Sequence, residues 1–528
     1  MSPRLTLSHS PGGHSPHRMG VVDVGSNSVR LVIFDDEARS PAYFFNEKVM
    51  CGLGQGLAES GLLNPQGRVR AIAALQRFAA VAGGMRVAPL RAVATAAVRE
   101  ARDGRDFCDE VRARTGLRLE IIDGDEEARL SAQGVLLGWP EADGVVCDLG
   151  GSSLEMARIG KGVVGARTSC PLGPFELQRL EGGAGARVRR IRGLLDAGRR
   201  RIGGGARRIF LVGGSFRVIA RLDMERRGYP LLVLHEYRMT PRGLVETLDR
   251  IAAADLDALR ARTGTSPQRM ELVPAAAEVL RELIDQLAPE EIDVSAYGLR
   301  EGLLFERMPD AVRRLDPLIE AAALAELSQS RMPGFGERLN GFLAPLFRKE
   351  TEARLRLVRA ACLLHDTTWR AHPDYRAEAC FDNVTRANLG GLDHPGRVFL
   401  GLALLHRYKN RRTGDRIEPL LTLLSQDEQR QAEVLGKAMR FGAMFAAGDP
   451  ARAGRLWWKR KKRVLGLDLT PEGAILFGEV TRARFLSLAQ ALRAKPEIRT
   501  AGDGGCSDPG GDPPDEDDGD REKGAARC

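Results

Sequence analysis

Two short segments of the chain share one pattern, which is an apolar strand, an acidic residue and a turn of small polar residues. The first is GVVDVGSNSVRLVIFD, with its acid at Asp23, and the second is GVVCDLGGSSLEM, with its acid at Asp148. Each predicts a hairpin of two strands, and the repeated pattern indicates an internal duplication. The small polar residues of the two turns are Gly25, Ser26, Asn27, Gly150, Gly151, Ser152 and Ser153.

The chemistry of these turns suits a phosphate ligand. Glycine lets the backbone approach a ligand closely, and successive N–H groups attract an anion. An aspartate at the end of each first strand is the kind of group that holds Mg²⁺ beside phosphate oxygens. One such turn alone is equally an ordinary turn capped by its acid. Two matching turns favour the phosphate site, and so does a third glycine turn at Gly213, Gly214 and Ser215 that opens a helix.

The elements that position these turns alternate between strands and helices up to residue 306. We expect strands within 21–34, near 42–45, at 90–94, ending at 123 and at 209–212, with a helix over 67–81. From 307 to 492 the apolar spacing predicts mainly helices, with a short strand pair within 454–478. The expected domains are a disordered extension (1–19, with Met19 as an alternative start), two α/β lobes (20–124 and 125–306), a helical domain with a small β element (307–498) and a disordered acidic tail (499–528).

Composition restricts the class of protein. The chain has 528 residues, 43% hydrophobic and 28% charged, with a net charge of +9, which is typical of a globular protein that can meet a polyanionic partner. No apolar run approaches the roughly 20 residues of a membrane span, so we expect no membrane association. The eight cysteines form no CxxC pair, which indicates reduced thiols in a cytoplasmic protein.

The motifs together resemble a known family. The segments DVGSNSVRL, DLGGSS and VGGSF are similar to those of the superfamily of acetate kinase, sugar kinases, heat-shock chaperone ATPases and actin. More narrowly, the chain resembles the exopolyphosphatase / guanosine pentaphosphate phosphohydrolase family. The narrowing segments are DVGSNSVRLVIFD (23–35), ATAAVREARDG (94–104), IIDGDEEARLSAQGV (121–135), CDLGGSSLEM (147–156) and YGLREGLLFE (297–306).

The resemblance implies an α/β fold of two duplicated ribonuclease H-like lobes, as in actin-like ATPases, with a cleft between them and a helical HD-related C-terminal domain. It implies a Mg²⁺-dependent hydrolase that removes the terminal phosphate of a phosphoanhydride chain, and a homodimer. Phosphoryl transfer needs positioning, charge neutralisation and an oriented nucleophile. By match to the family motif, Glu127 is the expected general base, and Glu126 is its neighbour to test. The alternative is that both carboxylates only favour the dipole at a helix start.

The resemblance also assigns the remaining site residues. Asp23 and Asp148 are the expected metal-side acids, and the residues of the two turns are expected to line the phosphate path. Thr95 and Arg99 are expected to contact phosphate, the alternative being a helix N-cap and a solvated arginine. The Gly213–Ser215 turn matches the one that holds adenosine in nucleotide-using relatives, and here it could serve only packing. The family usually has a third glycine where this chain has Ser152, so a positive φ there would cost about 1 kcal/mol.

Two features lie in the C-terminal half. His365-Asp366 resembles an HD motif, but no histidine lies between His235 and His365 to supply the upstream ligand. We therefore expect a structural module without metal, although His372, His394 and His406 leave the metal site open. The segment RLWWKRKKR (455–463) combines aromatic and basic residues. It favours a polyphosphate-guiding patch or a solvated hairpin over nucleic-acid binding.

The combined prediction is an exopolyphosphatase that releases orthophosphate from inorganic polyphosphate. Hydrolysis of guanosine pentaphosphate at the same site is the close enzymatic alternative. A third hypothesis is a non-catalytic sensor that binds guanosine tetraphosphate or polyphosphate. A kinase is less favoured because it needs a nucleotide donor and an acceptor pocket.

Overall fold

The computed structural model describes residues 18–35, 38–410 and 416–500. Most of the expected extension and tail therefore lies outside the described residues, but Met19 begins the first strand and Thr500 ends the last. The described chain forms two compact units, residues up to 337 with 350–436, and residues 338–349 with those from 437. Within these described ranges, no helix combines the length and the apolar character needed to cross a membrane.

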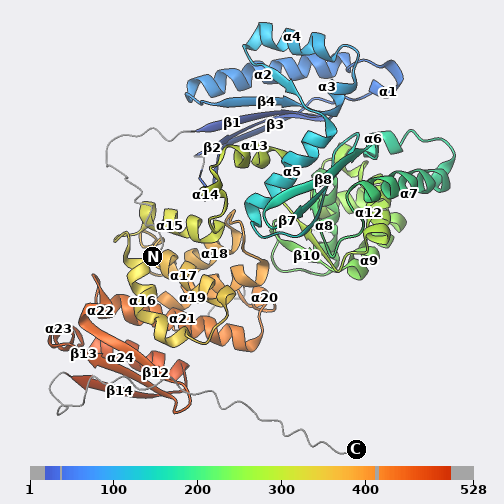
Figure 1. Ribbon diagram of the computed structural model, residues 1–528. Helices are drawn as coiled ribbons and strands as arrows, with labels where there is room; N and C mark the ends of the chain where they lie inside the picture. Colours follow the sequence, from blue (N-terminus) through green and yellow to red (C-terminus); the bar gives the residue numbers. More distant parts are fainter. Residues whose placement is uncertain (1–17, 36–37, 411–415, 501–528) are drawn as a thin grey trace, which may run out of the picture. The chain divides into compact units, whose positions relative to one another are not determined.

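The first unit begins with a five-stranded mixed sheet. Its strands are β1 (Met19–Val24), β2 (Ser28–Phe34), β3 (Tyr43–Met50), β4 (Leu90–Ala94) and β5 (Leu119–Ile121). They lie in the order β3-β2-β1-β4-β5, with β1 antiparallel to β2 and parallel to β4 (Figure 1). The predicted hairpin and the strand at 90–94 are confirmed, and the strand predicted near 42–45 continues to Met50.

A six-stranded mixed sheet follows in the same unit. Its strands are β6 (Gly144–Leu149), β7 (Leu154–Gly160), β8 (Val163–Cys170), β9 (Arg208–Val212), β10 (Tyr237–Met239) and β11 (Glu291–Val294). They lie in the order β10-β11-β9-β6-β7-β8. Strand β6 is antiparallel to β7 and parallel to β9. The second predicted hairpin is therefore also confirmed, and the α/β class with it.

The strand registers align polar residues in two rows. In the first sheet Asp23 lies opposite Arg30, which lies opposite Lys48. In the second sheet Asp148 lies opposite Glu155, which lies opposite Ser169. Residues directly opposite each other project from the same face of a sheet. Each sheet therefore presents a row of three polar side chains that starts at its first hairpin.

Helices of the first 310 residues complete the α/β part. They are α1 (Leu57–Ser60), α2 (Pro65–Gly84), α3 (Ala96–Glu100), α4 (Gly104–Thr115), α5 (Gly124–Gly138), α6 (Pro174–Leu177), α7 (Gly183–Arg201), α8 (Gly214–Arg226), α9 (Pro241–Ala253), α10 (Leu256–Thr263), α11 (Pro267–Met270), α12 (Val273–Leu287) and α13 (Leu299–Arg307). Helices α2 and α4 share a core with the first sheet. Helices α5 and α13 share one with strands of both sheets, so this pair ties the two sheets together.

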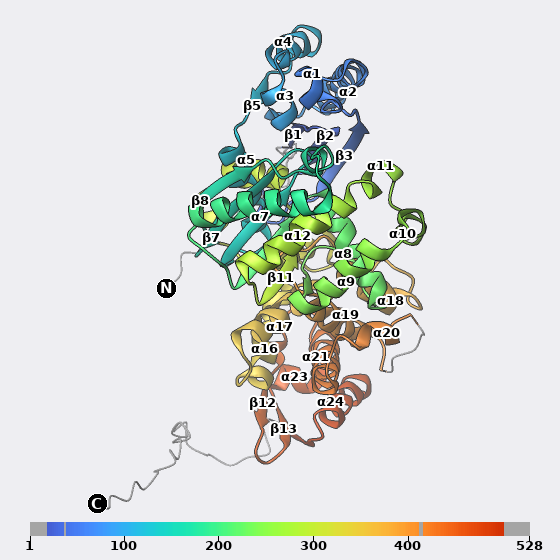
Figure 2. The same ribbon diagram turned by 90° about the vertical axis from the view of Figure 1, so that its right-hand side faces the viewer.

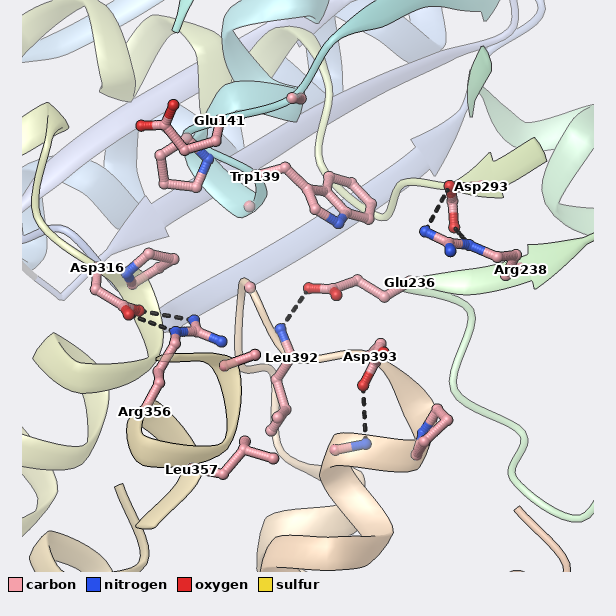
Figure 3. A pocket seen from close by; sticks show the side chains of 18 of the residues that line it. Trp139, Glu141, Glu236, Arg238, Asp293, Asp316, Arg356, Leu357, Leu392 and Asp393 are labelled. Atoms are coloured by element: carbon pink, nitrogen blue, oxygen red, sulfur yellow. Dashed lines mark hydrogen bonds and ion pairs between the residues drawn. The ribbon is translucent and has the colours of Figure 1, made fainter. Parts of the chain in front are cut away.

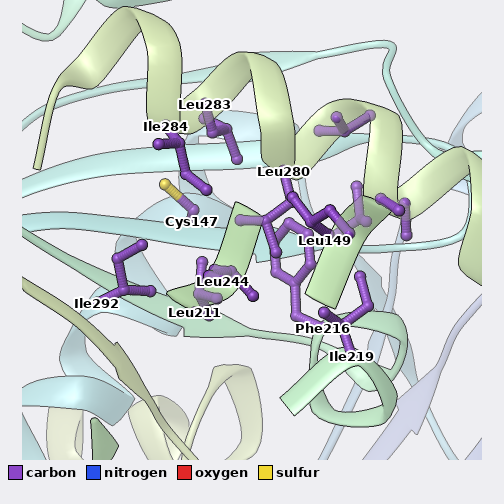
Figure 4. Close-up of a cluster of buried hydrophobic side chains, with 14 of the residues drawn as sticks. Cys147, Leu149, Leu211, Phe216, Ile219, Leu244, Leu280, Leu283, Ile284 and Ile292 are labelled. Atoms are coloured by element: carbon purple, nitrogen blue, oxygen red, sulfur yellow. The ribbon is translucent and has the colours of Figure 1, made fainter. Parts of the chain in front are cut away.

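The second sheet has its own core against α7, α8, α9 and α12. Leu149 and Leu211 extend from its strands, Phe216 from α8, and Leu280 and Leu283 from α12 (Figure 4). All of these side chains are almost completely buried. Burying such side chains stabilises the fold by about 1.5–3 kcal/mol each, and this rigid support holds the hairpin turn that follows Leu149.

The chain beyond residue 309 is mainly helical, as predicted. The helices are α14 (Asp310–Arg313), α15 (Pro317–Gln329), α16 (Phe335–Phe347), α17 (Glu352–Leu364), α18 (Arg376–Arg386), α19 (His394–Tyr408), α20 (Glu418–Leu421), α21 (Gln426–Phe445), α22 (Pro450–Ala453), α23 (Pro471–Leu476) and α24 (Glu479–Ala491).

The second unit contains a small three-stranded sheet. Its strands are β12 (Gly454–Lys459), β13 (Val464–Leu469) and β14 (Lys495–Thr500), in that order. The predicted strand pair is the hairpin of β12 and β13, and the basic segment 455–463 forms most of it. The sequence analysis missed β14, which pairs parallel with β13.

Candidate functional site

The two predicted turns meet inside the first unit. The Gly25 N–H donates to the Ser28 carbonyl oxygen at 3.0 Å, and the Gly150 N–H donates to the Ser153 carbonyl oxygen at 2.9 Å, so both turns close with the same hydrogen bond. The hydroxyl oxygens of Ser26 and Ser152 lie 3.3 Å apart. The structure therefore brings together two turns that the sequence separates by more than a hundred residues.

The close approach of the two turns requires a glycine at Gly151. A Cβ atom there would lie 2.9 Å from the Phe175 ring and 3.4 Å from Cβ of Ser26. Ser152, in contrast, is not among the described residues with positive φ. The expected cost of a serine with a positive φ therefore does not arise at Ser152. The Ser152 hydroxyl instead contributes to the contact between the two turns.

The two aspartates have different partners. The Asp23 carboxylate accepts a 2.9 Å hydrogen bond from Arg300 Nη1 on α13. The Asp148 carboxylate accepts a hydrogen bond from the Ser131 hydroxyl on α5. Burial and the charge of Asp23 raise the pKa of Asp148 although Ser131, Arg217 and Arg300 oppose this. The two acids thus act on each other electrostatically across the meeting point of the sheets.

Glu127 lies in the first turn of α5, but it does not cap that helix. The N-cap is Asp123, whose side chain accepts the Glu126 N–H at 2.7 Å. Glu127 Oε2 is buried and has no hydrogen-bond partner in the described chain. Burial and the charges of Glu155 and Asp148 raise its pKa well above the ordinary value. This is the condition of a general base that works near neutral pH, and it favours the catalytic interpretation over the helix-dipole alternative.

Glu155 belongs to the same acid cluster, and the sequence analysis missed it. Only 1% of the residue is exposed, Ser169 donates to its Oε1 at 2.8 Å, and its Oε2 has no partner in the described chain. Burial and the charge of Asp148 raise its pKa to about 7, against the opposing influence of the Ser153 and Ser169 hydroxyls. Glu155 stands seven residues after Asp148, at the position where the first hairpin has Arg30 after Asp23. This correspondence is the sequence signal that could have identified Glu155.

Thr95 and Arg99 both lie beside the cluster. The Thr95 N–H donates to the Val24 carbonyl oxygen at 3.1 Å, and its buried side chain makes no capping bond although it occupies the N-cap position of α3. Arg99 donates to the Ile122 carbonyl oxygen at 2.9 Å and lies 3.7 Å from Glu127 Oε2. Arg99 is therefore held against the candidate base rather than freely solvated.

The structure does not bring every predicted residue into the cluster. The Glu126 carboxylate pairs with Arg129, which also binds Glu306. Asn27 contributes its carbonyl oxygen to the N–H groups of Cys51 and Gly52 at 2.9 and 3.0 Å, and this fixes the loop after β3. The Glu126 side chain thus has a structural partner of its own, and the backbone of Asn27 has a structural role.

The third glycine turn lies next to the second hairpin. A Cβ atom on Gly213 would lie 2.4 Å from the Leu149 carbonyl oxygen, and its φ is +106°, so only glycine suits this position. A Cβ atom on Gly214 would lie 3.8 Å from the Arg269 side chain. Ser215 is buried at the start of α8. The turn therefore supports the strand end that carries Asp148 and faces a cation on α11.

The donors in the cluster suit a hard cation such as Mg²⁺. Across the described ranges, no three acid, histidine or cysteine side chains form a ready-made metal site. Mg²⁺ nevertheless needs only one or two carboxylates when water and phosphate oxygens complete its shell. The buried oxygens of Glu127 and Glu155 that lack a hydrogen-bond partner, together with Asp23 and Asp148, supply this type of donor.

The two residues of the HD-like motif, His365 and Asp366, are bound by other groups of the protein. Asp366 accepts hydrogen bonds from Arg331 Nε at 2.9 Å and Nη2 at 2.6 Å. His365 Nδ1 lies 2.8 Å from the Cys362 carbonyl oxygen, and burial lowers its pKa to about 4. His394 instead contacts Tyr229 and the His235 carbonyl oxygen. An arginine thus neutralises the aspartate that a metal would need.

A separate cavity of about 680 Å³ lies elsewhere in the first unit. Its walls include the ion pairs Arg356–Asp316 and Arg238–Asp293 (Figure 3). Glu236 points into it and accepts the Leu392 N–H at 2.8 Å. None of the predicted site residues lines this cavity. Its size alone does not make it the reaction site, because the buried acids Glu127, Asp148 and Glu155 and the phosphate-type turns are in the hairpin cluster.

Comparisons with known proteins match both the α/β part and the helical part of the chain. The model of the Ppx/GppA phosphatase family matches residues 32–311, and a model described as exopolyphosphatase, C-terminal, matches residues 319–497. Exopolyphosphatase 1 of Mycobacterium tuberculosis H37Rv is 29% identical over 329 residues, which cover 59% of this chain and 92% of that protein.

Two further similarities extend the comparison. Exopolyphosphatase 2 of the same organism is 27% identical over 311 residues, covering 54% of this chain and 97% of that protein. The crystal structure of an exopolyphosphatase from Cytophaga hutchinsonii has a TM-score of 0.50 at 23% identity, covering 55% of this chain and 96% of that one, and it shows a likeness of fold alone. Because the first family model spans more than half of the sequence, including the whole of the second hairpin, this chain belongs to the Ppx/GppA phosphatase family.

Proposed function

We propose that the protein is an exopolyphosphatase that hydrolyses the terminal phosphate of inorganic polyphosphate. The observation that carries the proposal is Glu127, a buried carboxylate whose Oε2 has no hydrogen-bond partner in the described chain and which lies beside both phosphate-type turns. The relatives named exopolyphosphatase support inorganic polyphosphate as the substrate over other phosphoanhydrides.

In the proposed reaction a water molecule attacks the terminal phosphorus. Glu127 orients this water and takes its proton, a new P–O bond forms, and the bond to the bridging oxygen breaks. The products are orthophosphate and a chain shorter by one phosphate. The N–H groups and hydroxyls of the two turns, with Arg99 at the side of Glu127, hold the terminal phosphate in place for this attack.

Mg²⁺ is the proposed cofactor, and Asp23, Asp148 and Glu155 are the residues that would hold it. When bound, it neutralises the charge of the phosphate oxygens. The Asp23–Arg300 contact shows that Asp23 already has a cationic partner. We therefore propose that Asp148 and Glu155, in the second hairpin, are the main metal ligands.

Finer expectations from the family resemblance belong to the same proposal. They are that the two lobes arose by duplication, that the helical region is a structural relative of HD domains, and that the protein acts as a cytoplasmic homodimer. The similar order of strands in the two sheets supports the duplication. Light scattering of the purified chain tests the dimer.

The test of the proposed function is release of orthophosphate from long-chain polyphosphate and from guanosine pentaphosphate under identical conditions. We expect faster, Mg²⁺-dependent turnover of polyphosphate and its loss in Glu127→Gln with polyphosphate binding retained. A wild-type protein that binds polyphosphate but releases no orthophosphate would instead support the sensor hypothesis.

A further inference from the structure

The cavity beside the second sheet has walls from both the α/β part and the helical part of the first unit. They come from the end of α5, from strands β9, β10 and β11, and from α15, α17 and α19, and Figure 2 shows α17 and α19 close to β11. The volume of about 680 Å³ lies within the roughly 300–1,000 Å³ of pockets that hold small molecules. A ligand in this cavity would therefore occupy a site separate from the hairpin cluster.

Acids match the charges of most arginines in the cavity wall. Four of these arginines form ion pairs within the wall, Arg208 and Arg238 with Asp293, Arg354 with Glu428 and Arg356 with Asp316. The fifth, Arg314, is exposed, and so is the acid Glu141. Two acids remain, Glu236 and Asp393, and neither forms an ion pair with an arginine or lysine in the described chain. The wall therefore carries an excess of negative charge at these two acids.

Glu236 is the more unusual of the two acids. Only 5% of the residue is exposed, and its side chain points into the cavity (Figure 3). Its Oε1 accepts the Leu392 N–H at 2.8 Å, whereas no hydrogen bond reaches its Oε2 within the described residues. Its backbone φ of +65° is a conformation that costs energy for a residue with a side chain. The fold therefore holds one oxygen of a buried carboxylate toward the cavity in spite of an energetic cost.

Neighbouring basic groups do not neutralise Glu236 by direct contact. His235 Nε2 lies 3.6 Å from its Oε1, but burial and the charges of nearby arginines lower the pKa of His235 well below its ordinary value, so this histidine is neutral. Arg397 donates to three backbone carbonyl oxygens instead. In contrast, five other buried acids each lie within 4.0 Å of an arginine, namely Asp223, Glu282, Asp293, Glu301 and Asp366. The contrast indicates that the cavity supplies the cation that Glu236 lacks.

We infer that this cavity binds a small organic cation with two or more amino groups, of which one contacts Glu236 and another contacts Asp393. The carbon chain between the amino groups would pack against the apolar part of the wall, which includes Trp139, Pro317, Leu357, Leu392 and Phe399. A polyphosphate ligand does not suit this wall, because four of its five arginines already have acidic partners. The inference does not depend on the proposed function.

The surroundings of Glu236 agree with a site for a cation. Burial raises the pKa of Glu236 to about 7, and the charges of Asp393 and Asp293 act in the same direction, whereas the Leu392 N–H and Arg397 oppose them. A bound ammonium group relieves the repulsion between the acids and favours the ionised carboxylate. Binding should therefore become stronger as the pH rises from 6 to 8 and Glu236 loses its proton.

The other titratable groups around Glu236 do not change their charge in this pH range. Burial lowers the pKa of His394 to about 4 and that of His235 well below its ordinary value, so both histidines are neutral. Burial raises the pKa of Tyr297, so its phenol keeps its proton. A change of affinity between pH 6 and 8 would therefore report on Glu236.

The test is calorimetric titration of spermidine into the full-length protein without polyphosphate, because the polyanion would itself bind the probe. The site variants are Glu236→Gln, which keeps an acceptor for the Leu392 N–H, and Asp393→Asn, which keeps a helix N-cap. The control is Glu59→Gln, which removes an exposed acid on α1. We expect the Kd of spermidine to rise about tenfold or more in each site variant and to stay at the wild-type value in the control.

Two further measurements locate the bound amine. n-Butylamine has only one amino group and should bind at least about tenfold more weakly than spermidine. The Kd of spermidine should fall from pH 6 to pH 8 in the wild type and stay constant in Glu236→Gln. Spermidine should also change the tryptophan fluorescence, and Trp139→Phe should abolish this change.

The inference would be overturned by a wild-type protein that shows no saturable binding of spermidine. Equal Kd values in the wild type, the site variants and the control would also overturn it, because they would indicate binding to scattered surface acids. If Glu236→Gln unfolds, Asp393→Asn decides the question, since Asp393 is exposed. Orthophosphate release from polyphosphate is a separate readout, so failure of the proposed function and failure of this site are distinguishable.

Discussion

The hydroxyl oxygens of Ser26 and Ser152 lie 3.3 Å apart although 126 positions separate the two residues in the sequence. Both side chains are buried, and each belongs to a turn that follows an acid-bearing strand. This one contact sets the two turns side by side. It links the part of the site on the first sheet to the part on the second, which the shared core of α5 and α13 also holds together.

The first prediction concerns this contact. Ser26→Ala and Ser152→Ala should each lower the free energy of unfolding by about 1 kcal/mol, because each removes one partner of a buried hydrogen bond. In a double-mutant cycle the pair should show a coupling energy of about 0.5–1 kcal/mol. Urea unfolding of the four proteins measures it. Strictly additive effects would mean that the hydroxyls do not bond each other.

The second prediction separates the two adjacent glutamates of α5. Glu127→Gln should lower kcat by about 10²–10⁴-fold, the usual contribution of a positioned general base, because the amide cannot accept the proton of the attacking water. Glu126→Gln is the matched control, since its carboxylate pairs with Arg129 instead. It should retain most of the activity. Steady-state orthophosphate release measures both, and an equal loss in the two variants would contradict the assignment.

The third prediction is the pH dependence of activity. A base must be ionised to act, and the pKa of Glu127 is raised by burial and by Glu155, whose own pKa is about 7. We therefore expect kcat/KM to rise with pH through a midpoint well above the ordinary glutamate value. In Glu155→Gln the midpoint of the residual activity should move to lower pH, because one negative charge beside Glu127 is gone. An unchanged midpoint would contradict this coupling.

The fourth prediction addresses the metal. Removal of divalent cations with EDTA should abolish turnover, and Mg²⁺ should restore it. Asp148→Asn should raise the Mg²⁺ concentration needed for half-maximal activity by about 10- to 100-fold. Asp143→Asn, an exposed residue just before β6, is the control and should behave as the wild type. Full activity in EDTA would remove Mg²⁺ from the proposed mechanism.

The local part of the fold could be predicted from the sequence. The hairpins around Gly25 and Gly150 and the strand at 90–94 have strong apolar patterns bounded by small residues, and these local signals fix their positions. Strand β14 was missed because KPEIRT is largely polar and exposed, which is typical of an edge strand. Its place depends on pairing with β13 and not on its own composition.

The partners of the site residues could not be predicted in the same way. Arg300 reaches Asp23 from 277 positions away, and no local pattern marks either residue for the other. Glu155 looks like one polar residue of an alternating strand until its register sets it opposite Asp148. Motif comparison therefore located the turns and Glu127. The neighbours that determine the electrostatic surroundings of these residues depend on the packing of the whole unit.

The last prediction concerns stability and follows from Glu155. Its pKa is raised from an ordinary value near 4.5 to about 7 in the folded protein, so the folded state binds its proton more tightly than the unfolded state. This stabilisation is fully present below about pH 4.5 and is lost as the pH rises through 7. Glu155→Gln keeps an acceptor for Ser169 but has no proton to lose. The variant should match the wild type in acid and exceed its free energy of unfolding by about 3 kcal/mol at pH 8. Urea unfolding at several pH values measures this, with Glu126→Gln as the control, and a constant difference from pH 5 to 8 would show that Glu155 is already ionised in the folded protein.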